Sequence, residues 1–488
     1  MQAPAFTVSL EELLPAAAAW PALLTFVVGA AILLTLIQLG RWLAQGLGLQ
    51  RWGSPEALLA GGLGLLLAPN GPLPLIPEPV IQLWSGLPLV LLTLVFATLL
   101  LAKPLPAISG LWRPLSAQIL LALTLAFGQY LVAGLVVLLW LQPLLGSSPV
   151  MACLIEVAYE GGHGSAAALG ASYTRLGFPG GESLGLALST VGLLASTLVG
   201  GLLVVIGRRR GWCLTPAIPD PALQAPEPGP IKATGASSQD ARGHDTAGSS
   251  SPSAGPPPSM AQRFRDWARN LGLIGGVVLL GWSALMLLQR IAAHGRATAA
   301  AVVEALPVFP LALLASLLMR WLLERGGRQA WVSAPIQRQV GTISADLLIT
   351  AATACLDLHE LAREWLPLTA LAVAGLAWNL AVVLLLAPRI LPANWFERGL
   401  VEFGQATGVA ASGLLLLAMV DPEDRNGTLT PFSIKQMLLQ PLLAGGVITV
   451  VAPLTVQAWG LPLWTTICGL LVLLWIGLGL RLAAGSEV

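Results

Sequence analysis

The chain contains repeated apolar stretches of about 20 residues, the length that an α-helix needs to cross the hydrocarbon core of a bilayer. Of its 488 residues 56% are hydrophobic, and only 10% are Asp, Glu, Lys or Arg. Soluble domains carry about 25% charged residues, with which they cover their surface. Because a bilayer accepts apolar side chains directly, the sequence predicts an all-α polytopic membrane protein, multi-pass in the plasma (inner) membrane.

The predicted spans fall into two sets on either side of a polar interruption. This interruption, residues 207–270, contains a stretch rich in Pro, Ser, Gly and Ala and nearly free of large apolar side chains. Such a stretch cannot bury enough surface to offset its chain entropy, so we predict a disordered linker. The predicted spans are 21–39, 57–68, 80–102, 115–140 and 184–206 before the linker, and 271–289, 302–323, 340–356, 366–387, 438–456 and 461–482 after it.

Basic residues predict the orientation, because Lys and Arg concentrate in cytoplasmic loops. The run Arg208–Arg210 lies at the start of the linker, and Arg263 and Arg265 lie near its end. We therefore place the linker in the cytoplasm, and five preceding spans place the N-terminus outside. Arg290 and Arg296 fall on the outer side in this scheme and are its exceptions.

An odd number of spans before a cytoplasmic linker means that the second half enters the membrane from the opposite side. We predict an inverted repeat of five-span halves, residues 1–206 and 271–460, followed by an extra span and tail over 461–488. Each half also has one apolar span that holds a lone amide. These amides are Gln129 in LTLAFGQYLVAGL and Asn379 in VAGLAWNLAVVLL.

Each lone amide is followed by a run of small residues that is too polar for an ordinary span. The runs are Glu160–Gly170, EGGHGSAAALG, and Glu402–Gly413, EFGQATGVAASG. Glycine inside a helix costs about 1 kcal/mol relative to alanine, so such runs favour a bend. We predict a re-entrant hairpin at about 150–174 and another at about 399–420. The alternative is that the small residues only let helices pack closely.

Two hairpins that enter from opposite faces would meet near the midplane, where transporters bind their substrates. Helix N-termini there would stabilise an anionic carboxylate. No cationic partner for a substrate carboxylate is visible inside the predicted spans, so these N-termini would replace one. The predicted substrate-binding residues are Gly161, Gly162, His163, Gly164, Ser165, Gly404, Gln405, Ala406, Thr407, Gly408, Ser412, Gln129 and Asn379.

A sodium site is predicted from carbonyls, hydroxyls and one carboxylate. Asp346 lies in the eighth predicted span, with Thr350 and Thr353 one and two turns further on. Charged side chains within spans are costly, which makes Asp346 a functional candidate. We predict that these three residues, with Ser165 and Thr407, hold the ion. The alternative is that Asp346 lies near the cytoplasmic end and is solvated.

Other polar side chains leave alternatives open. His163 would touch the substrate or tie down the hairpin tip. Gln129 and Asn379 would bind the hairpin backbone, the substrate, or only a neighbouring helix. Glu156 and Glu160 are four residues apart and would share a helix face; they would carry protons, repel anions, or lie solvated at the exterior mouth.

The two small-residue runs resemble a known family. Gly161–Ala166, GGHGSA, followed by AALG, is similar to the GGHGT-A signature of the glutamate:sodium symporter (ESS) family. Trp395–Pro422, WFERGLVEFGQATGVAASGLLLLAMVDP, resembles the C-terminal pore-loop region of a subgroup, and Asp346–Leu358 and GLAWNL are also similar. The resemblance implies two re-entrant loops, sodium-coupled glutamate uptake, alternating access by a moving transport domain, and a homodimer.

The sequence departs from the family in several places. Ser165 replaces the motif threonine, Glu156 and Glu160 occupy a run where small or hydroxyl residues are expected, and the linker and last span are additional. Another carboxylate, coupled to protons or sodium, is therefore an alternative substrate.

Two other classes remain possible from the sequence. An intramembrane hydrolase would use Ser165 and His163, although the chain has no GxSG or GxGD motif, and a non-transporting sensor is the third class. We expect no enzyme activity, no cofactor besides sodium as coupling ion, and no nucleic-acid partner, since the net charge is +1. The expected partners are a small anionic substrate, membrane lipid and a second copy of the chain.

Overall fold

The computed structural model describes residues 15–46, 56–103, 112–213, 260–294, 303, 306–391 and 393–484. These residues form helices and no strand, as predicted. Eight helices in the described ranges are long and apolar enough to cross a membrane. They are α1 (Pro15–Gly46), α3 (Glu78–Leu99), α4 (Trp112–Val136) with its continuation to Leu145, α9 (Gly181–Arg210), α10 (Met260–Ala293), α15 (Trp365–Ala381) with its continuation to Ile390, α17 (Trp395–Val420) and α20 (Leu461–Ala484).

The other helices are shorter or more polar. Two of them continue a long helix through a π-helical turn, η2 (Val137–Leu141) into α5 (Gln142–Leu145) and η5 (Val382–Leu386) into α16 (Ala387–Ile390). The remaining ones are α2 (Glu56–Leu67), η3 (Pro149–Cys153), α6 (Leu154–Tyr159), α7 (Gly162–Ala168), α8 (Gly170–Arg175), α12 (Val308–Arg325), η4 (Gln329–Trp331), α13 (Ala334–Ala354), α14 (Leu358–Arg363), α18 (Leu429–Leu439) and α19 (Val447–Trp459).

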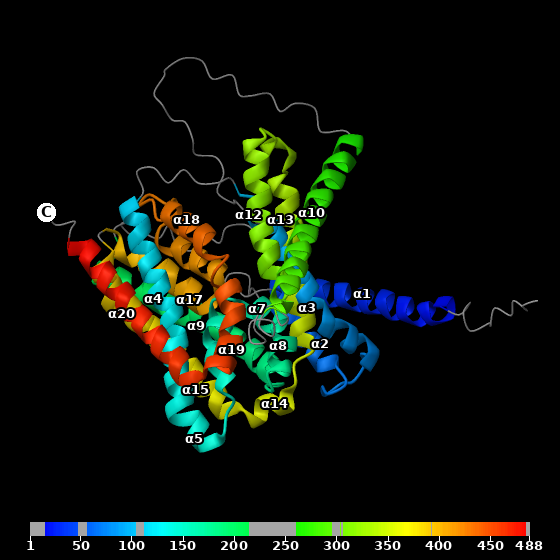
Figure 1. Ribbon diagram of the computed structural model, residues 1–488, viewed down its shortest axis with the longest axis horizontal. Helices are drawn as coiled ribbons and strands as arrows, with labels where there is room; N and C mark the ends of the chain where they lie inside the picture. Colours follow the sequence, from blue (N-terminus) through cyan, green and yellow to red (C-terminus); the bar gives the residue numbers. More distant parts are fainter. Residues whose placement is uncertain are drawn as a thin grey trace, which may run out of the picture.

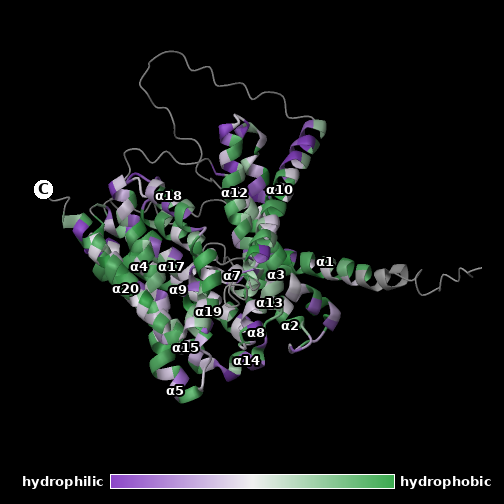
Figure 2. Cartoon of the chain, viewed as in Figure 1, coloured by the Kyte–Doolittle hydropathy of each residue, from purple (hydrophilic) through white to green (hydrophobic). Residues whose placement is uncertain are grey.

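The long helices carry an apolar outer surface. Leu470 and Leu473 on α20 are 63% and 68% exposed, and Leu279 on α10 is 63% exposed. Hydrophobic residues predominate along the long helices, whereas hydrophilic ones gather near the ends of α10 and α12 (Figure 2). A water-soluble protein rarely exposes apolar surface on this scale, so the chain is a multi-pass membrane protein.

The helices form two groups that lie side by side (Figure 1). The first group contains α1, α2, α3, α10, α12 and α13, and the second contains α4, α9, α15, α17, α18, α19 and α20. Close packing within each group depends on glycines. A methyl group at Gly281 of α10 would lie 2.8 Å from Cα of Ala312 on α12, and one at Gly40 of α1 would lie 2.8 Å from Cβ of Ala60 on α2. Each group therefore combines helices from both halves of the sequence.

The predicted spans correspond to helices, with two differences. The helices α9 and α10 extend to Arg210 and from Met260, so both reach into the predicted linker, whose residues 214–259 lie outside the described ranges. The predicted span 438–456 is instead a pair of helices, α18 and α19, separated by Gln440–Gly446. In this break Ala444 and Gly445 have φ of 53° and 92°, which an α-helix cannot contain.

Candidate functional site

Helix α17 reverses its direction in the middle. Gly408 has φ −153° and ψ 39°, and Val409 has φ 67° and ψ 168°, so neither is helical. A methyl group at Gly404 would lie 2.5 Å from Cα of Gly413. Nine residues of continuous helix would separate these positions by about 13 Å. The chain therefore forms a helical hairpin, the second hairpin, whose tip is Gly408–Val409, and α17 is not one span despite its length.

The first hairpin comprises η3, α6, α7 and α8, and it packs along helix α9. Leu154 and Ala166 both lie beside Gly185, whereas Tyr159 lies beside Gly192, about two turns further along α9. The chain thus runs along α9 toward Gly192 and then back. Its tip is the segment Glu160–Gly162, in which Gly162 has φ 69°.

The two hairpins approach the same point of α9 from opposite ends. In the second hairpin Phe396 lies beside Gly207, and the carbonyl of Thr407 lies beside Gly192. The tips also touch, because a methyl group at Gly162 would lie 2.6 Å from Cγ1 of Val409. Positive φ is rare for a β-branched residue, so the tip at Val409 is strained. Two opposed hairpins therefore meet tip to tip at the middle of one long helix.

The two lone amides meet each other at this junction. The Gln129 Nε2 group donates to Asn379 Oδ1 at 3.2 Å and to the carbonyl of Ala406 at 2.6 Å. Asn379 Nδ2 donates to the same carbonyl at 2.8 Å and to the Thr407 hydroxyl at 3.0 Å. Both side chains are fully buried. They satisfy the backbone carbonyl of Ala406, near the end of a helix arm, where carbonyls lack helical partners.

Replacing Asn379 with leucine is expected to destabilise the second hairpin. The variant removes two donors from buried oxygens, which costs about 1–3 kcal/mol for each group left unpaired. Gln129→Leu should cost a similar amount, and the double variant less than the sum, because each single variant already loses the hydrogen bond between the two amides. Thermal unfolding of the three purified variants measures this. Fully additive effects would contradict a shared role.

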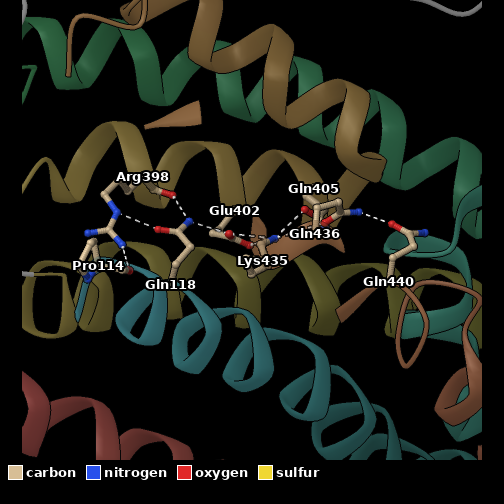
Figure 3. Close-up of polar contacts among 8 residues, drawn as sticks. All are labelled: Pro114, Gln118, Arg398, Glu402, Gln405, Lys435, Gln436 and Gln440. Atoms are coloured by element: carbon tan, nitrogen blue, oxygen red, sulfur yellow. Dashed lines mark hydrogen bonds and ion pairs between the residues drawn. The ribbon is translucent and has the colours of Figure 1, made fainter. Parts of the chain in front are cut away.

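A chain of buried polar contacts runs beside the second hairpin (Figure 3). Lys435 of α18, 1% exposed, lies 2.9 Å from both carboxylate oxygens of Glu402, which is 2% exposed. The Lys435 ammonium also donates to Gln405 Oε1 at 2.8 Å. Gln118 of α4 donates to Glu402 at 2.6 Å and accepts from Arg398 Nε at 2.8 Å. Buried charges persist only when paired in this way.

The break between α18 and α19 is held by Glu156 of the first hairpin. The fully buried Glu156 carboxylate accepts from the backbone N–H of Ala444 at 3.0 Å, the Thr449 hydroxyl at 2.9 Å and the Tyr130 hydroxyl at 2.5 Å. This carboxylate satisfies the N–H group of Ala444, which lies in the break three residues before α19 begins. The side chain is therefore buried and structural, whereas solvation at an exterior mouth was one prediction.

A small pocket, here called the central pocket, lies between the first hairpin tip and the polar chain. Its volume leaves room for about one water molecule. Its polar wall joins a carboxylate, an ammonium and three amides. The lining residues are Ala122, Glu160, Gln405, Lys435, Gln436, Leu439, Gln440, Leu443 and Ala444.

The predicted substrate-binding residues lie at the two tips and on the helices beside them. His163 Nε2 lies 2.9 Å from the Thr190 hydroxyl of α9, so this ring ties the first hairpin to α9. The Ser165 hydroxyl donates to the carbonyl of Gly161 at 3.1 Å, and Gly164 packs against Leu92 of α3. The structure brings together Gly161, Gly162, His163, Gly164, Ser165, Gly404, Gln405, Ala406, Thr407, Gly408, Ser412, Gln129 and Asn379.

The predicted sodium ligands on α13 lie elsewhere. Asp346 is paired with Arg41 at 3.3 Å. The Thr350 hydroxyl donates to the carbonyl of Ala57 at 3.2 Å, and Thr353 packs against Gly61 of α2. These three residues thus face α1 and α2, and the structure does not bring them to Ser165 and Thr407. Their sodium role stays a prediction.

The sequence reasoning missed the buried cation. Lys435 is one of only three lysines in the chain, and it lies three residues before the predicted span 438–456, so the search for charges within the predicted spans does not include it. A signal was present in Glu402, since a carboxylate inside an apolar hairpin needs a cationic partner. The predicted role of helix N-termini stays a prediction, and the Lys435 ammonium is a buried cation at the second hairpin that the sequence analysis did not include.

Comparison with known proteins gives no relative: no family model, no curated protein and no solved structure matches this chain.

Proposed function

We propose that this protein is a secondary active transporter of small carboxylate anions. The observation that carries the proposal is the meeting of two opposed hairpins at Gly192 of α9, beside a buried pocket that contains Lys435. Irregular backbone at membrane depth is tolerated where it is buried in protein or lines a cavity. Transporters bind substrates at such broken helices near the midplane, and an ammonium group there would pair with a carboxylate.

Several matched features support an inverted repeat with re-entrant hairpins. The helices α4 and α15 each end in a π-helical turn followed by a proline-containing turn, η2 with α5 and η5 with α16. Each precedes a hairpin, and each carries one of the two amides that meet. The 30-residue α9 then has its counterpart in residues 429–459, where α18 and α19 form a broken helix. The helix α20 would be additional to the repeat.

The two helix groups suggest how access would alternate. The second group holds both hairpins, and the first group meets it through apolar side chains such as Leu92 and Leu348 against Gly164. Apolar contacts of this kind are non-directional, so they permit one group to move against the other. We propose that the second group is the moving transport domain, and that the resemblance to the glutamate:sodium symporter family makes a homodimer the expected assembly.

Glutamate and sodium are the substrate and ion to test first, because the chain resembles the glutamate:sodium symporter family. A local observation favours a cation: the buried Gln129 Oε1 has no hydrogen-bond partner among the described residues, and oxygen atoms are the ligands of hard cations. The test is uptake of labelled glutamate, aspartate, succinate and pyruvate into liposomes that contain the purified protein. Uptake driven by an inward sodium gradient supports the proposal, and no uptake of any of these acids under sodium or proton gradients contradicts it.

A hydrolase is less well supported than a transporter. Ser165 and His163 do not pair, since the Ser165 hydroxyl donates to the carbonyl of Gly161 and His163 contacts Thr190. A serine nucleophile needs a base within hydrogen-bond reach. We therefore keep non-enzymatic transport as the proposed function. Ser165→Ala is expected to retain substrate binding, whereas it would abolish hydrolytic turnover.

We expect the open ends of the two hairpins to be accessible from opposite sides of the membrane. The first hairpin ends at Arg175 near the start of α9, and the second ends before Glu423, near the basic end of α9. Both side chains are exposed. In a variant without native cysteines, a membrane-impermeant maleimide added outside should label Arg175→Cys, and Glu423→Cys only after permeabilisation. Labelling of both from one side would contradict opposed re-entrant hairpins and the cytoplasmic linker.

A further inference from the structure

We propose that Glu160 carries a proton across the membrane together with the substrate anion, which makes the transporter a proton symporter. This inference rests on the proposed function and assigns its coupling residue. Glu160 lies at the tip of the first hairpin and is 8% exposed. Its side chain lines the central pocket with Lys435 and Gln440. Within the described part of the chain its carboxylate accepts no hydrogen bond and forms no ion pair.

The contrast with Glu156 shows why Glu160 is the residue that exchanges a proton. The carboxylate of Glu156 accepts from three donors, Ala444, Thr449 and Tyr130, and does not line the central pocket. Three of its roughly four acceptor positions serve the fold. Glu160 has none of these bonds, although a buried carboxylate without partners is costly unless it binds a cation or a proton. Its oxygens are therefore the ones open to a ligand.

The charges around the central pocket make anion binding depend on a proton. Glu402 from α17 and Lys435 from α18 form a neutral pair, and Glu156 from α6, bonded to Tyr130 of α4, adds a further negative charge near Glu160. A substrate carboxylate that approaches Lys435 would meet the like charge of Glu160 in a low-dielectric site. It binds favourably only when Glu160 is neutral, so proton and anion bind together.

The transport step balances without any further reactant. A proton from water on one side forms an O–H bond with a carboxylate oxygen of Glu160, and the anion pairs with the Lys435 ammonium. After the second helix group has moved, the anion leaves and the O–H bond releases the proton to water on the other side. The central pocket has room for about one water molecule, so in this conformation it does not hold a larger acid beside Glu160.

Sodium at the same position is disfavoured by geometry. An ion bound to Glu160 would lie beside the Lys435 ammonium, which already takes the oxygen of Gln405. Two cations would then compete for the same oxygens in a pocket of this size. A proton removes the charge of Glu160 and needs no ligand shell.

The test compares Glu160→Gln with Glu78→Gln, an exposed carboxyl at the start of α3. Because Gln mimics the protonated acid, Glu160→Gln should exchange internal for external labelled substrate almost as wild type does. Its accumulation under an inward proton gradient should fall about tenfold or more, within the range typical of coupled sites. Glu78→Gln should retain both activities.

A second readout needs no transported substrate. Infrared difference spectra of the reconstituted protein should show a carboxyl C=O band that titrates with pH, is absent in Glu160→Gln, and is present in Glu78→Gln. An unchanged band in Glu160→Gln would overturn the proposal, and so would proton-driven accumulation equal to that of wild type. Sodium-driven uptake that Glu160→Gln leaves intact overturns proton coupling while the proposed function stands. If the protein transports none of the acids, both the proton coupling and the proposed transport function are wrong.

Discussion

Replacing Lys435 with methionine is expected to abolish carboxylate uptake and to destabilise the protein strongly. The change removes the only side chain that forms an ion pair with Glu402 in the described part of the chain, and it leaves a carboxylate of 2% exposure uncompensated. Breaking a buried ion pair by removing one partner costs about 3–5 kcal/mol. The substrate would also lose the cation that we propose as its partner. Thermal unfolding and uptake into liposomes measure the two losses.

The double variant Lys435→Met with Glu402→Gln separates folding from function. Removing both charges leaves no unpaired ion, so stability should return to within about 1–2 kcal/mol of wild type, because a buried pair is often nearly neutral overall. Uptake should stay absent, since no ammonium faces the central pocket. If the double variant transports at wild-type rates, Lys435 serves only the fold, and the proposed substrate contact is wrong.

The large-scale features of this fold follow from hydropathy and small-residue patterns. Apolar length predicted most of the long helices, because a span needs a nearly continuous apolar run. The glycine runs predicted where α6–α7 and α17 reverse, and the lone amides Gln129 and Asn379 marked the junction where they meet. Each of these features depends on residues close together in the sequence, so one amino-acid sequence is sufficient to predict them.

The long-range pairings could not be predicted. Lys435 and Glu402 are 33 residues apart, and Glu156 reaches Ala444 across 288 residues. No pattern in one sequence specifies such contacts. The break before α19 was missed because its residues Gln440–Gly446 lie within an otherwise apolar stretch. Asp346 was predicted to bind sodium because it is a carboxylate within a span, one and two turns before two threonines, whereas the partner that the structure gives it, Arg41, lies on a helix far away in the sequence.

Helix α9 connects the two hairpins, and glycines set their distance from it. Gly185 admits Ala166 of the first hairpin, and Gly200 admits Leu416 of the second. Gly192 lies between them and contacts both hairpins, through Tyr159 on one side and the carbonyl of Thr407 on the other. If the tips must shift against each other during transport, this position controls how closely they can pack at the point where they meet.

A single methyl group at Gly192 is therefore expected to disable the protein. In Gly192→Ala the new Cβ would meet the carbonyl oxygen of Thr407 and the ring of Tyr159, so both hairpin tips must shift. Overpacking of this kind costs about 1–3 kcal/mol, and we expect uptake to fall by roughly tenfold or more. Gly201→Ala is the matched control on the same helix, because nothing lies within 4 Å of its new Cβ. Alanine favours a helix over glycine by about 1 kcal/mol, so the control should be as stable as wild type or more so. Equal uptake by the two variants would mean that the tips do not need this close approach to α9, and that the site at their junction is not where transport occurs.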